Sequence, residues 1–383
     1  MKLRTVITAL LAGTLLAVGG AHGSETGPLV IGVTISQTGS ATGTAAYVLQ
    51  GYQRWVGDAN HHGGLLGRPV QLRVYDDRSD PQTAAALYRK LITEDKVDLL
   101  AGPYASAVSQ VVIPVTEEAH RVLIGQTAAT SLFEGTHYAV QGFPQGSTYL
   151  PGVADVAKGA GYHTVALLAN DAPGTLEICA GLRARAQALG LTVVLDRSYP
   201  RTTTVFGGYA AEARAAGADV VAGCAFLPDL IALARELAAQ GVKPKLEVFS
   251  IGPTDPTFGA SLGPVAEGVL GSTTWWPSLK TKGNVDFVAS YERTFHRTPV
   301  YHSAAAYASL QVLAAAVRTA GSLDQDTIRT ALGSLQRSTV AGTFRIDASG
   351  RQIGYGSYLM QWQGGVQKLV WPAATAETPV RTG

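Results

Sequence analysis

The chain has 383 residues, of which 46% are hydrophobic, and its 30 Lys and Arg nearly balance its 28 Asp and Glu. A single hydrophobic core stops growing at about 250–300 residues, so we expect two lobes. The near-neutral charge excludes bulk electrostatic attraction to nucleic acid or to an anionic bilayer. Only two cysteines are present, which excludes a disulfide-stapled small domain and a Cys-rich metal site.

The N-terminal segment has the pattern of a secretory signal. Lys2 and Arg4 precede an apolar run over residues 6–18 and small residues over 19–24. A membrane anchor is the alternative, but the run is shorter than the roughly 20 residues that span a bilayer. We expect residues 1–23 to be a cleaved signal peptide and the mature protein, with a formal charge of zero, to reside in the periplasm.

The first part of the mature chain alternates strands and helices. Residues 29–35 are expected to form a strand, 44–59 an amphipathic helix, and Asp80 the N-cap of a second helix that begins at Pro81. Further strands are expected at 97–101 and 121–124. Such alternation builds a parallel sheet whose strand ends face a crevice, which is where a ligand site belongs.

The same pattern restarts after Pro144. Here the expected strands are 164–169, 192–195, 219–223, 246–250 and 269–274, and the expected helices are 149–158, 229–240, 285–295 and 303–320. Residues 344–346 and 355–362 are expected to form a late β-hairpin. The fold class is therefore α/β, with two doubly wound parallel-sheet lobes joined by a multi-strand hinge.

We assign residues 27–142 and 273–350 to lobe 1, and residues 143–272 and 351–372 to lobe 2. Residues 373–383 are small and polar, and we expect them to form a frayed tail. Cys179 and Cys224 are either bridged, which export permits, or two buried thiols.

Several short motifs, in order and spacing, resemble the periplasmic binding proteins of the Leu/Ile/Val-binding type. They are 31–39 (IGVTISQTG), Gly51, 63–69 (GGLLGRP), 75–77 (YDD), 80–81 (DP), 102–106 (GPYAS), 267–269 (EGV) and 299–307. The resemblance covers roughly residues 29–372. It implies a type I periplasmic binding fold and a monomeric receptor that carries a small molecule to the membrane subunits of an ABC importer.

The resemblance also implies where lobe 1 holds a ligand carboxylate. A hydroxyl after the third strand falls on Ser106, and an Ala/Thr turn after the fourth strand falls within 126–130, which gives Thr127, Ala128, Ala129 and Thr130. Helix N-terminal amides and hydroxyls stabilise an anion without a full countercharge. The alternative for Ser106 is that it only N-caps the following helix.

Three departures from the amino-acid receptors argue against a standard amino acid. Thr44 replaces an aromatic residue of the first loop, although Tyr47 lies one turn further along, and Pro173-Gly174 replaces Tyr-Gly. The acidic partner of the ligand ammonium falls near Thr254, with Asp255 one position late. A buried ammonium without a carboxylate is costly, so we expect the candidate ligands to include aromatic and other organic acids and amides as well as amino acids.

Aromatic side chains are the candidate walls of the cleft. Tyr104, Phe226 and the pair Trp275-Trp276 offer stacking surfaces for a planar or apolar ligand. The alternative is that one tryptophan of the pair packs within the hinge and the other is partly exposed.

Enzyme readings are less favoured. Ser261 lies in a G-x-S-x-G pattern (259–263), but a nucleophile elbow needs a strand directly before it and a helix directly after it. His61-His62 lacks a third metal ligand. We therefore expect no catalysis, no cofactor and no metal, and we retain two alternatives to the carrier: a ligand sensor of the same fold and, remotely, a secreted hydrolase using Ser261.

Overall fold

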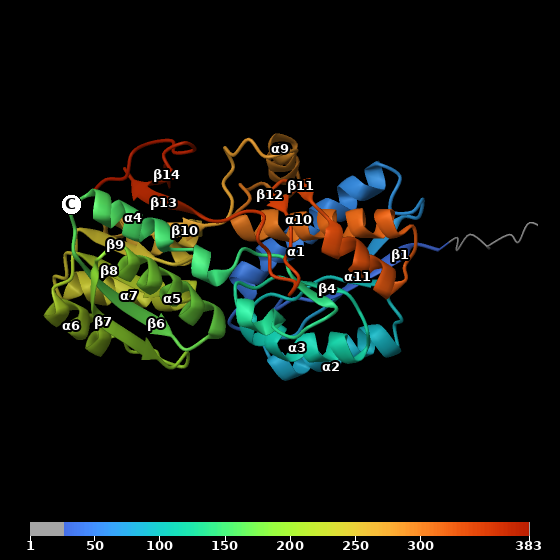
Figure 1. Cartoon of the computed structure of the whole chain (residues 1–383), viewed down its shortest axis with the longest axis horizontal. Helices are drawn as coiled ribbons and strands as arrows, with labels where there is room; N and C mark the ends of the chain where they lie inside the picture. Colours follow the sequence, from blue (N-terminus) through green and yellow to red (C-terminus); the bar gives the residue numbers. More distant parts are fainter. Residues whose placement is uncertain (1–26, 383) are drawn as a thin grey trace, which may run out of the picture.

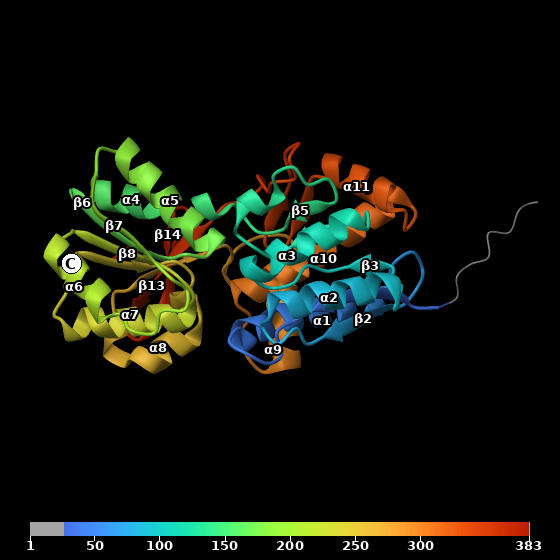
Figure 2. The same ribbon diagram turned by 90° about the horizontal axis from the view of Figure 1, so that it is seen from below.

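The computed structural model describes residues 27–382 and shows two α/β lobes lying side by side (Figures 1 and 2). The predicted signal peptide lies outside the described residues. None of the helices in the described range is long and apolar enough to cross a membrane.

Lobe 1 is built on a parallel sheet in the order β2-β1-β3, and a parallel bridge between Tyr104 and Gln126 leads on to the pair β4-β5. These strands are β1 (Leu29–Thr34), β2 (Val70–Tyr75), β3 (Leu99–Leu100), β4 (Leu123–Gly125) and β5 (Ala139–Gln141). Their apolar side chains point into two cores, one on each face of the sheet.

Helices from both ends of the chain cover this sheet. Buried residues of α2 and α3 form the core on one face, and those of α1, α9, α10 and α11 form the core on the other. The helices are α1 (Thr42–His61), α2 (Pro81–Thr93), α3 (Ser106–Glu118), α9 (Asn284–Phe295), α10 (Tyr301–Ala320) and α11 (Gln325–Ser334). At Gly51 the backbones of α1 and α10 approach so closely that a Cβ would lie 2.3 Å from the carbonyl oxygen of Ser303.

Lobe 2 holds one seven-stranded sheet in the order β14-β13-β10-β9-β8-β6-β7, in which β13 and β14 run antiparallel to their neighbours. The strands are β6 (Thr164–Asn170), β7 (Thr192–Tyr199), β8 (Val220–Cys224), β9 (Leu246–Phe249), β10 (Leu270–Thr273), β13 (Tyr358–Gln363) and β14 (Val366–Trp371). Its helices are α4 (Pro151–Gly159), α5 (Pro173–Ala188), α6 (Gly207–Ala216), α7 (Leu227–Ala239) and α8 (Pro256–Leu262).

Three segments connect the lobes: one after β5, one after β10 and one just before β13. The second connection passes from a lobe 2 strand to Trp275, which is buried in the core of lobe 1. The α/β fold class predicted from the sequence is confirmed.

The predicted late hairpin is wrong. The structure has two hairpins instead, β11 (Arg337–Thr339) with β12 (Gly342–Phe344) in lobe 1, and β13 with β14 in lobe 2. Strand β13 pairs with β10, which lies almost ninety residues earlier in the sequence. A local sequence pattern does not predict such a distant pairing.

The expectation of a frayed tail is also wrong. The Glu377 carboxylate accepts hydrogen bonds from Trp276 Nε1 (3.0 Å), Ser278 Oγ (2.9 Å) and the Leu369 amide (3.1 Å). Further along, the Arg381 amide donates to Gln361 Oε1 (2.8 Å). The segment is therefore fastened to lobe 2 and to the hinge.

Cys179 and Cys224, which the sequence left open, form a disulfide bond. Cys179 lies on α5 and Cys224 ends β8, and both are almost completely buried. The bond therefore joins a helix that begins at the interlobe cleft to a central strand of the lobe 2 sheet.

Candidate functional site

The carboxyl ends of the parallel strands in both lobes face the cleft, and so do the N-termini of the helices that follow them. Helices α3, α5 and α7 begin there, after Ala105, Ala172 and Phe226, and none of the three has a side-chain N-cap. The free amides and the helix dipoles create a positive potential at this point.

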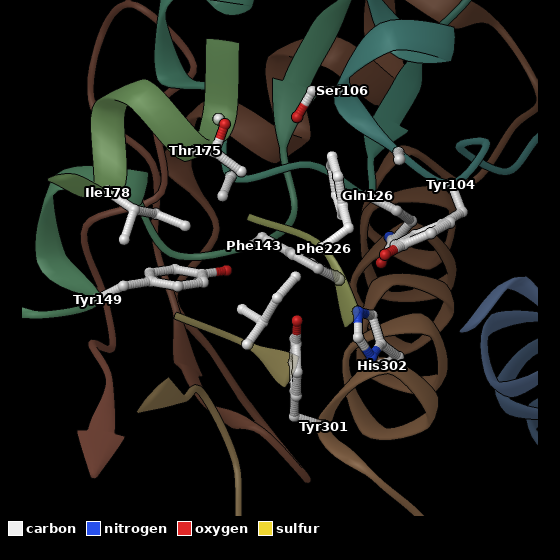
Figure 3. Close-up of a pocket in the computed structure, with 14 residues that line it drawn as sticks. Tyr104, Ser106, Gln126, Phe143, Tyr149, Thr175, Ile178, Phe226, Tyr301 and His302 are labelled. Atoms are coloured by element: carbon white, nitrogen blue, oxygen red, sulfur yellow. The ribbon is translucent and has the colours of Figure 1, made fainter. Parts of the chain in front are cut away.

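These three helix N-termini meet at a small inner cavity (Figure 3). Its volume is about 30 Å³, enough for about two water molecules. It is lined by Tyr104, Ala105, Ser106, Gln126, Ala128, Phe143, Tyr149, Gly174, Thr175, Ile178, Phe226, Ile251, Tyr301 and His302. None of these side chains is Asp, Glu, Lys or Arg.

The lobes touch each other beside this cavity. A Cβ at Gly174 would lie 2.7 Å from Ser106 Oγ, so a larger residue there would force the serine side chain or the lobes to move. Next to it the lobe 2 carboxylate of Glu177 accepts hydrogen bonds from the amides of Thr130 (2.7 Å) and Ser131 (3.0 Å) of lobe 1. A ring-sized ligand exceeds the inner volume, so we expect the lobes of the ligand-bound protein to lie slightly further apart than in this closed arrangement, and those of the free protein to open wider still.

The inner cavity adjoins a larger outer cavity of about 670 Å³, and Tyr104, Ala105, Phe226, Ile251 and His302 line both. The outer cavity contains the charged groups: Asp229, Asp255 and Arg201. Burial raises the pKa of Asp229, whose Oδ2 accepts a hydrogen bond from Asn170 Nδ2 (3.2 Å).

Ser106 does not cap its helix. It is the first residue of α3, and its hydroxyl is bonded to Thr127 Oγ1 at 2.5 Å. Thr127 Oγ1 in turn accepts a hydrogen bond from the Ala129 amide (3.1 Å). The alternative in which Ser106 only caps α3 is therefore wrong, and its hydroxyl is held at the cavity wall.

The floor of the cavity is aromatic and uncharged. The His302 ring lies 5.2 Å from that of Tyr104 and 3.9 Å from that of Tyr301. Burial lowers the pKa of His302 to about 3, so the imidazole is neutral at physiological pH. Burial also raises the pKa of Tyr104, Tyr149 and Tyr301, so these phenols stay protonated.

The structure brings together some of the residues predicted from the sequence and not others. Tyr104, Ser106, Ala128 and Phe226 line the inner cavity, while Thr254 and Asp255 line the outer cavity. The Asp255 carboxylate also caps α8, accepting a hydrogen bond from the Thr257 amide (2.8 Å).

Five predicted residues, Trp275 among them, line neither the inner nor the outer cavity. Thr127 and Ala129 lie behind Ser106, and Thr130 faces Glu177. The Tyr47 ring lies under the Arg297 guanidinium, 4.0 Å away.

Trp275 likewise packs in the hinge, as the alternative for the tryptophans expected. Its side chain is buried, and its Nε1 donates to Asn284 Oδ1 (2.7 Å). It lines a separate cavity behind the hinge.

Sequence reasoning missed much of the inner lining. The residues not singled out are Phe143, Tyr149, Ile178, Ile251, Tyr301 and His302. Tyr149 follows the first connection between the lobes, so an aromatic residue beside the predicted hinge was the available signal. Tyr301 and His302 open α10, which α9 separates from the second connection, and no such signal pointed to them.

The hydrolase alternative has the wrong local structure. Ser261 lies inside α8, and a 3₁₀ turn (Gly252–Thr254) rather than a strand precedes that helix. A nucleophile elbow requires the serine between a strand and a helix.

Comparison with known proteins identifies the family. Residues 28–367 match the family described as periplasmic binding protein. A relative from Brucella abortus, Leu/Ile/Val-binding protein homolog 2, is 26% identical over 361 residues, covering 92% of this chain and 94% of its own.

Two solved structures share the fold. A solute-binding protein of an ABC transporter from R. palustris, in complex with benzoate, has a TM-score of 0.81 at 20% identity, covering 92% of this chain and 98% of its own. The branched-chain amino acid transporter substrate-binding protein LivJ from Streptococcus pneumoniae, in complex with isoleucine, has a TM-score of 0.81 at 19% identity, covering 90% and 100%. The chain belongs to the periplasmic binding protein family.

Proposed function

We propose that this protein is an extracytoplasmic receptor that closes its two lobes around a small organic carboxylate and delivers it to the membrane subunits of an ABC importer. The observation that supports this most directly is the convergence of three uncapped helix N-termini on an inner cavity whose lining residues carry no ionised side chain. Such a site favours one negative charge on an otherwise uncharged ligand.

The ligand carboxylate would bind at Ser106 and the neighbouring amides of α3. The ligand body would lie against Phe143, Ile178, Phe226 and Ile251. The relatives bind ligands of two kinds, an amino acid and an aromatic acid. The carboxylates that would hold an ammonium, Asp229 and Asp255, lie in the outer cavity, and Asp255 is engaged as a helix cap. This favours an acid without an ammonium group.

A thermal-shift and calorimetric screen of the exported protein tests the proposal. The screen should contain benzoate, aliphatic acids, dicarboxylates, benzamide and isoleucine. We expect the monocarboxylates to raise the unfolding temperature most. Ser106→Ala should weaken the best carboxylate by about 1–3 kcal/mol, or about 5- to 150-fold, because a hydrogen bond to a charged group is lost.

Ser109→Ala is the matched control. Ser109 lies one turn further along α3, is fully buried and lines neither the inner nor the outer cavity, so its loss should leave the affinity unchanged. A strain lacking the protein should also lose high-affinity uptake of the ligand identified. Carboxylates that bind equally to Ser106→Ala, or a ligand recovered chemically altered, would contradict the proposal.

A further inference from the structure

The inner cavity contains polar groups for which a carboxylate alone provides no partner. Tyr149 Oη, His302 Nε2 and Gln126 Oε1 are buried and have no hydrogen-bond partner. All three residues line this cavity, and their exposed fractions are only 2%, 6% and 0%. Buried polar atoms are nearly always hydrogen-bonded, so three unpartnered atoms in one cavity indicate a polar group of the ligand.

Two of these groups, Tyr149 and His302, lie across the pocket from the carboxylate end, and Gln126 lies at mid-height beside Tyr104 (Figure 3). In Figure 3 the Ser106 hydroxyl is at the top of the pocket, whereas Tyr149, Tyr301 and His302 lie below the middle of it, and the Tyr149 and Tyr301 hydroxyls point toward its centre. Apolar side chains, among them Phe226 and Phe143, lie between the two ends. A ligand that satisfies both ends therefore has a polar group at each side of an apolar body.

The chemistry of the three atoms selects a neutral group that both donates and accepts. The amide nitrogen of Gln126 donates to Ser309 Oγ, which leaves Oε1 as an acceptor. The neutral His302 ring has one donor and one acceptor nitrogen, and the Tyr149 phenol does both. A second carboxylate on the ligand would face the Gln126 acceptor, and no cationic side chain lines the cavity to offset its charge. An ammonium group on the ligand would likewise find no anionic side chain there. A hydroxyl group matches the site.

We propose that Tyr149, His302 and Gln126 form a hydroxyl-recognition site, and that the protein selects ring-hydroxylated aromatic carboxylates over unsubstituted ones. This inference rests on the proposed function, since it takes the carboxylate to bind at Ser106. The specificity is then set by Tyr149 beside the first connection, His302 at the start of α10 and Gln126 directly after β4.

Calorimetry with a matched ligand series tests the inference. The series consists of benzoate, the 3- and 4-hydroxybenzoates and the 3- and 4-methylbenzoates. The hydroxyl and methyl substituents are similar in size, and benzoate has neither. At least one hydroxybenzoate should bind about tenfold or more tightly than its methyl counterpart, because only the hydroxyl provides partners for the buried atoms.

Tyr149→Phe should reduce that ratio to about two or less while leaving the affinity for the methyl compound nearly unchanged. Tyr355→Phe is the control: Tyr355 is also a tyrosine at the hinge, but its hydroxyl already donates to the Gly142 carbonyl (3.0 Å) and it does not line the cavity. In Tyr355→Phe the ratio of hydroxybenzoate to methylbenzoate affinity should match that of the unchanged protein.

The outcomes separate the two proposals. If benzoate binds in a Ser106-dependent way but the hydroxyl and methyl compounds bind equally, the hydroxyl site is overturned and the proposed function stands. If Tyr149→Phe weakens both compounds alike, the hydroxyl site is overturned as well. If no carboxylate binds, both proposals fall. The ligand series on the unchanged protein decides the matter even if the variant does not fold.

Discussion

His302 illustrates how one buried side chain couples the cleft to the stability of the whole protein. Its ring packs between those of Tyr104 and Tyr301, and burial lowers its pKa to about 3. The unfolded chain takes up a proton at this histidine below about pH 6.5, whereas the native protein does not until about pH 3. The contribution of the neutral ring to the free energy of unfolding is therefore complete above pH 6.5 and is lost as the pH falls toward 3.

We expect the free energy of unfolding of the unchanged protein to depend more strongly on pH than that of His302→Phe. Between pH 6.5 and 4.5 the unchanged protein should lose about 2 kcal/mol more of its free energy of unfolding than the variant, as urea titrations would measure. His62→Asn, at an exposed histidine, is the control and should follow the unchanged protein. Parallel curves for all three proteins would show that His302 does not carry this pH dependence.

The disulfide between Cys179 and Cys224 acts at the level of two elements, because it fixes α5 to β8 in lobe 2. The two residues are 45 positions apart, and closing a loop of that length in the unfolded chain is worth about 4 kcal/mol. Helix α5 also provides Gly174 and Glu177 at the lobe contact, so the bond stabilises an element that faces the ligand.

Replacing both cysteines by alanine should therefore lower the midpoint of thermal unfolding by several degrees or more, as calorimetry would show. Reductant should shift the unchanged protein in the same direction. It should leave the double variant unaffected. A midpoint in the unchanged protein that does not respond to complete reduction would contradict the prediction.

Helices and strands with a clear local hydrophobic pattern could be predicted from the sequence. Residues 44–59 and 164–169 have clear periodicity and flanking turns, and α1 (Thr42–His61) and β6 (Thr164–Asn170) lie where they were expected. Helix α6 was missed because its Gly- and Ala-rich sequence buries only Ala210 and Ala213.

The site could be predicted only in part, for a related physical reason. Ser106 lies in the segment after β3 and Phe226 in the segment after β8. Parallel strand ends meet at one edge of a sheet, so the place of both residues could be predicted. Tyr149 reaches the cavity from the first hinge connection and His302 from the start of α10, and where the two meet depends on how the lobes pack. The sequence alone does not contain that packing geometry.

At the scale of the whole molecule, Gly174 lies at a tight contact between the two lobes. A Cβ there would lie 2.7 Å from Ser106 Oγ and 3.4 Å from the Ala129 amide nitrogen. Gly174→Val should keep the lobes apart, reduce ligand affinity about tenfold or more, and prevent the decrease in radius of gyration that we expect on binding.

Solution scattering with and without saturating ligand measures this effect. Gly208→Val is the control, because it lies in α6 with nothing within 4 Å of its added Cβ. That variant should contract on binding like the unchanged protein. Normal contraction and affinity in Gly174→Val would show that closure does not require this approach.

The crossing of α1 and α10 at Gly51 and Ser303 has a consequence for biosynthesis. During translation α1 leaves the ribosome about 250 residues before α10, its neighbour in the finished lobe. A contact so distant along the chain forms late, after a large loop has closed. The nascent polypeptide thus carries an apolar helical stripe without its cover for most of its synthesis, and any fragment ending before Tyr301 would keep that stripe exposed and prone to aggregate.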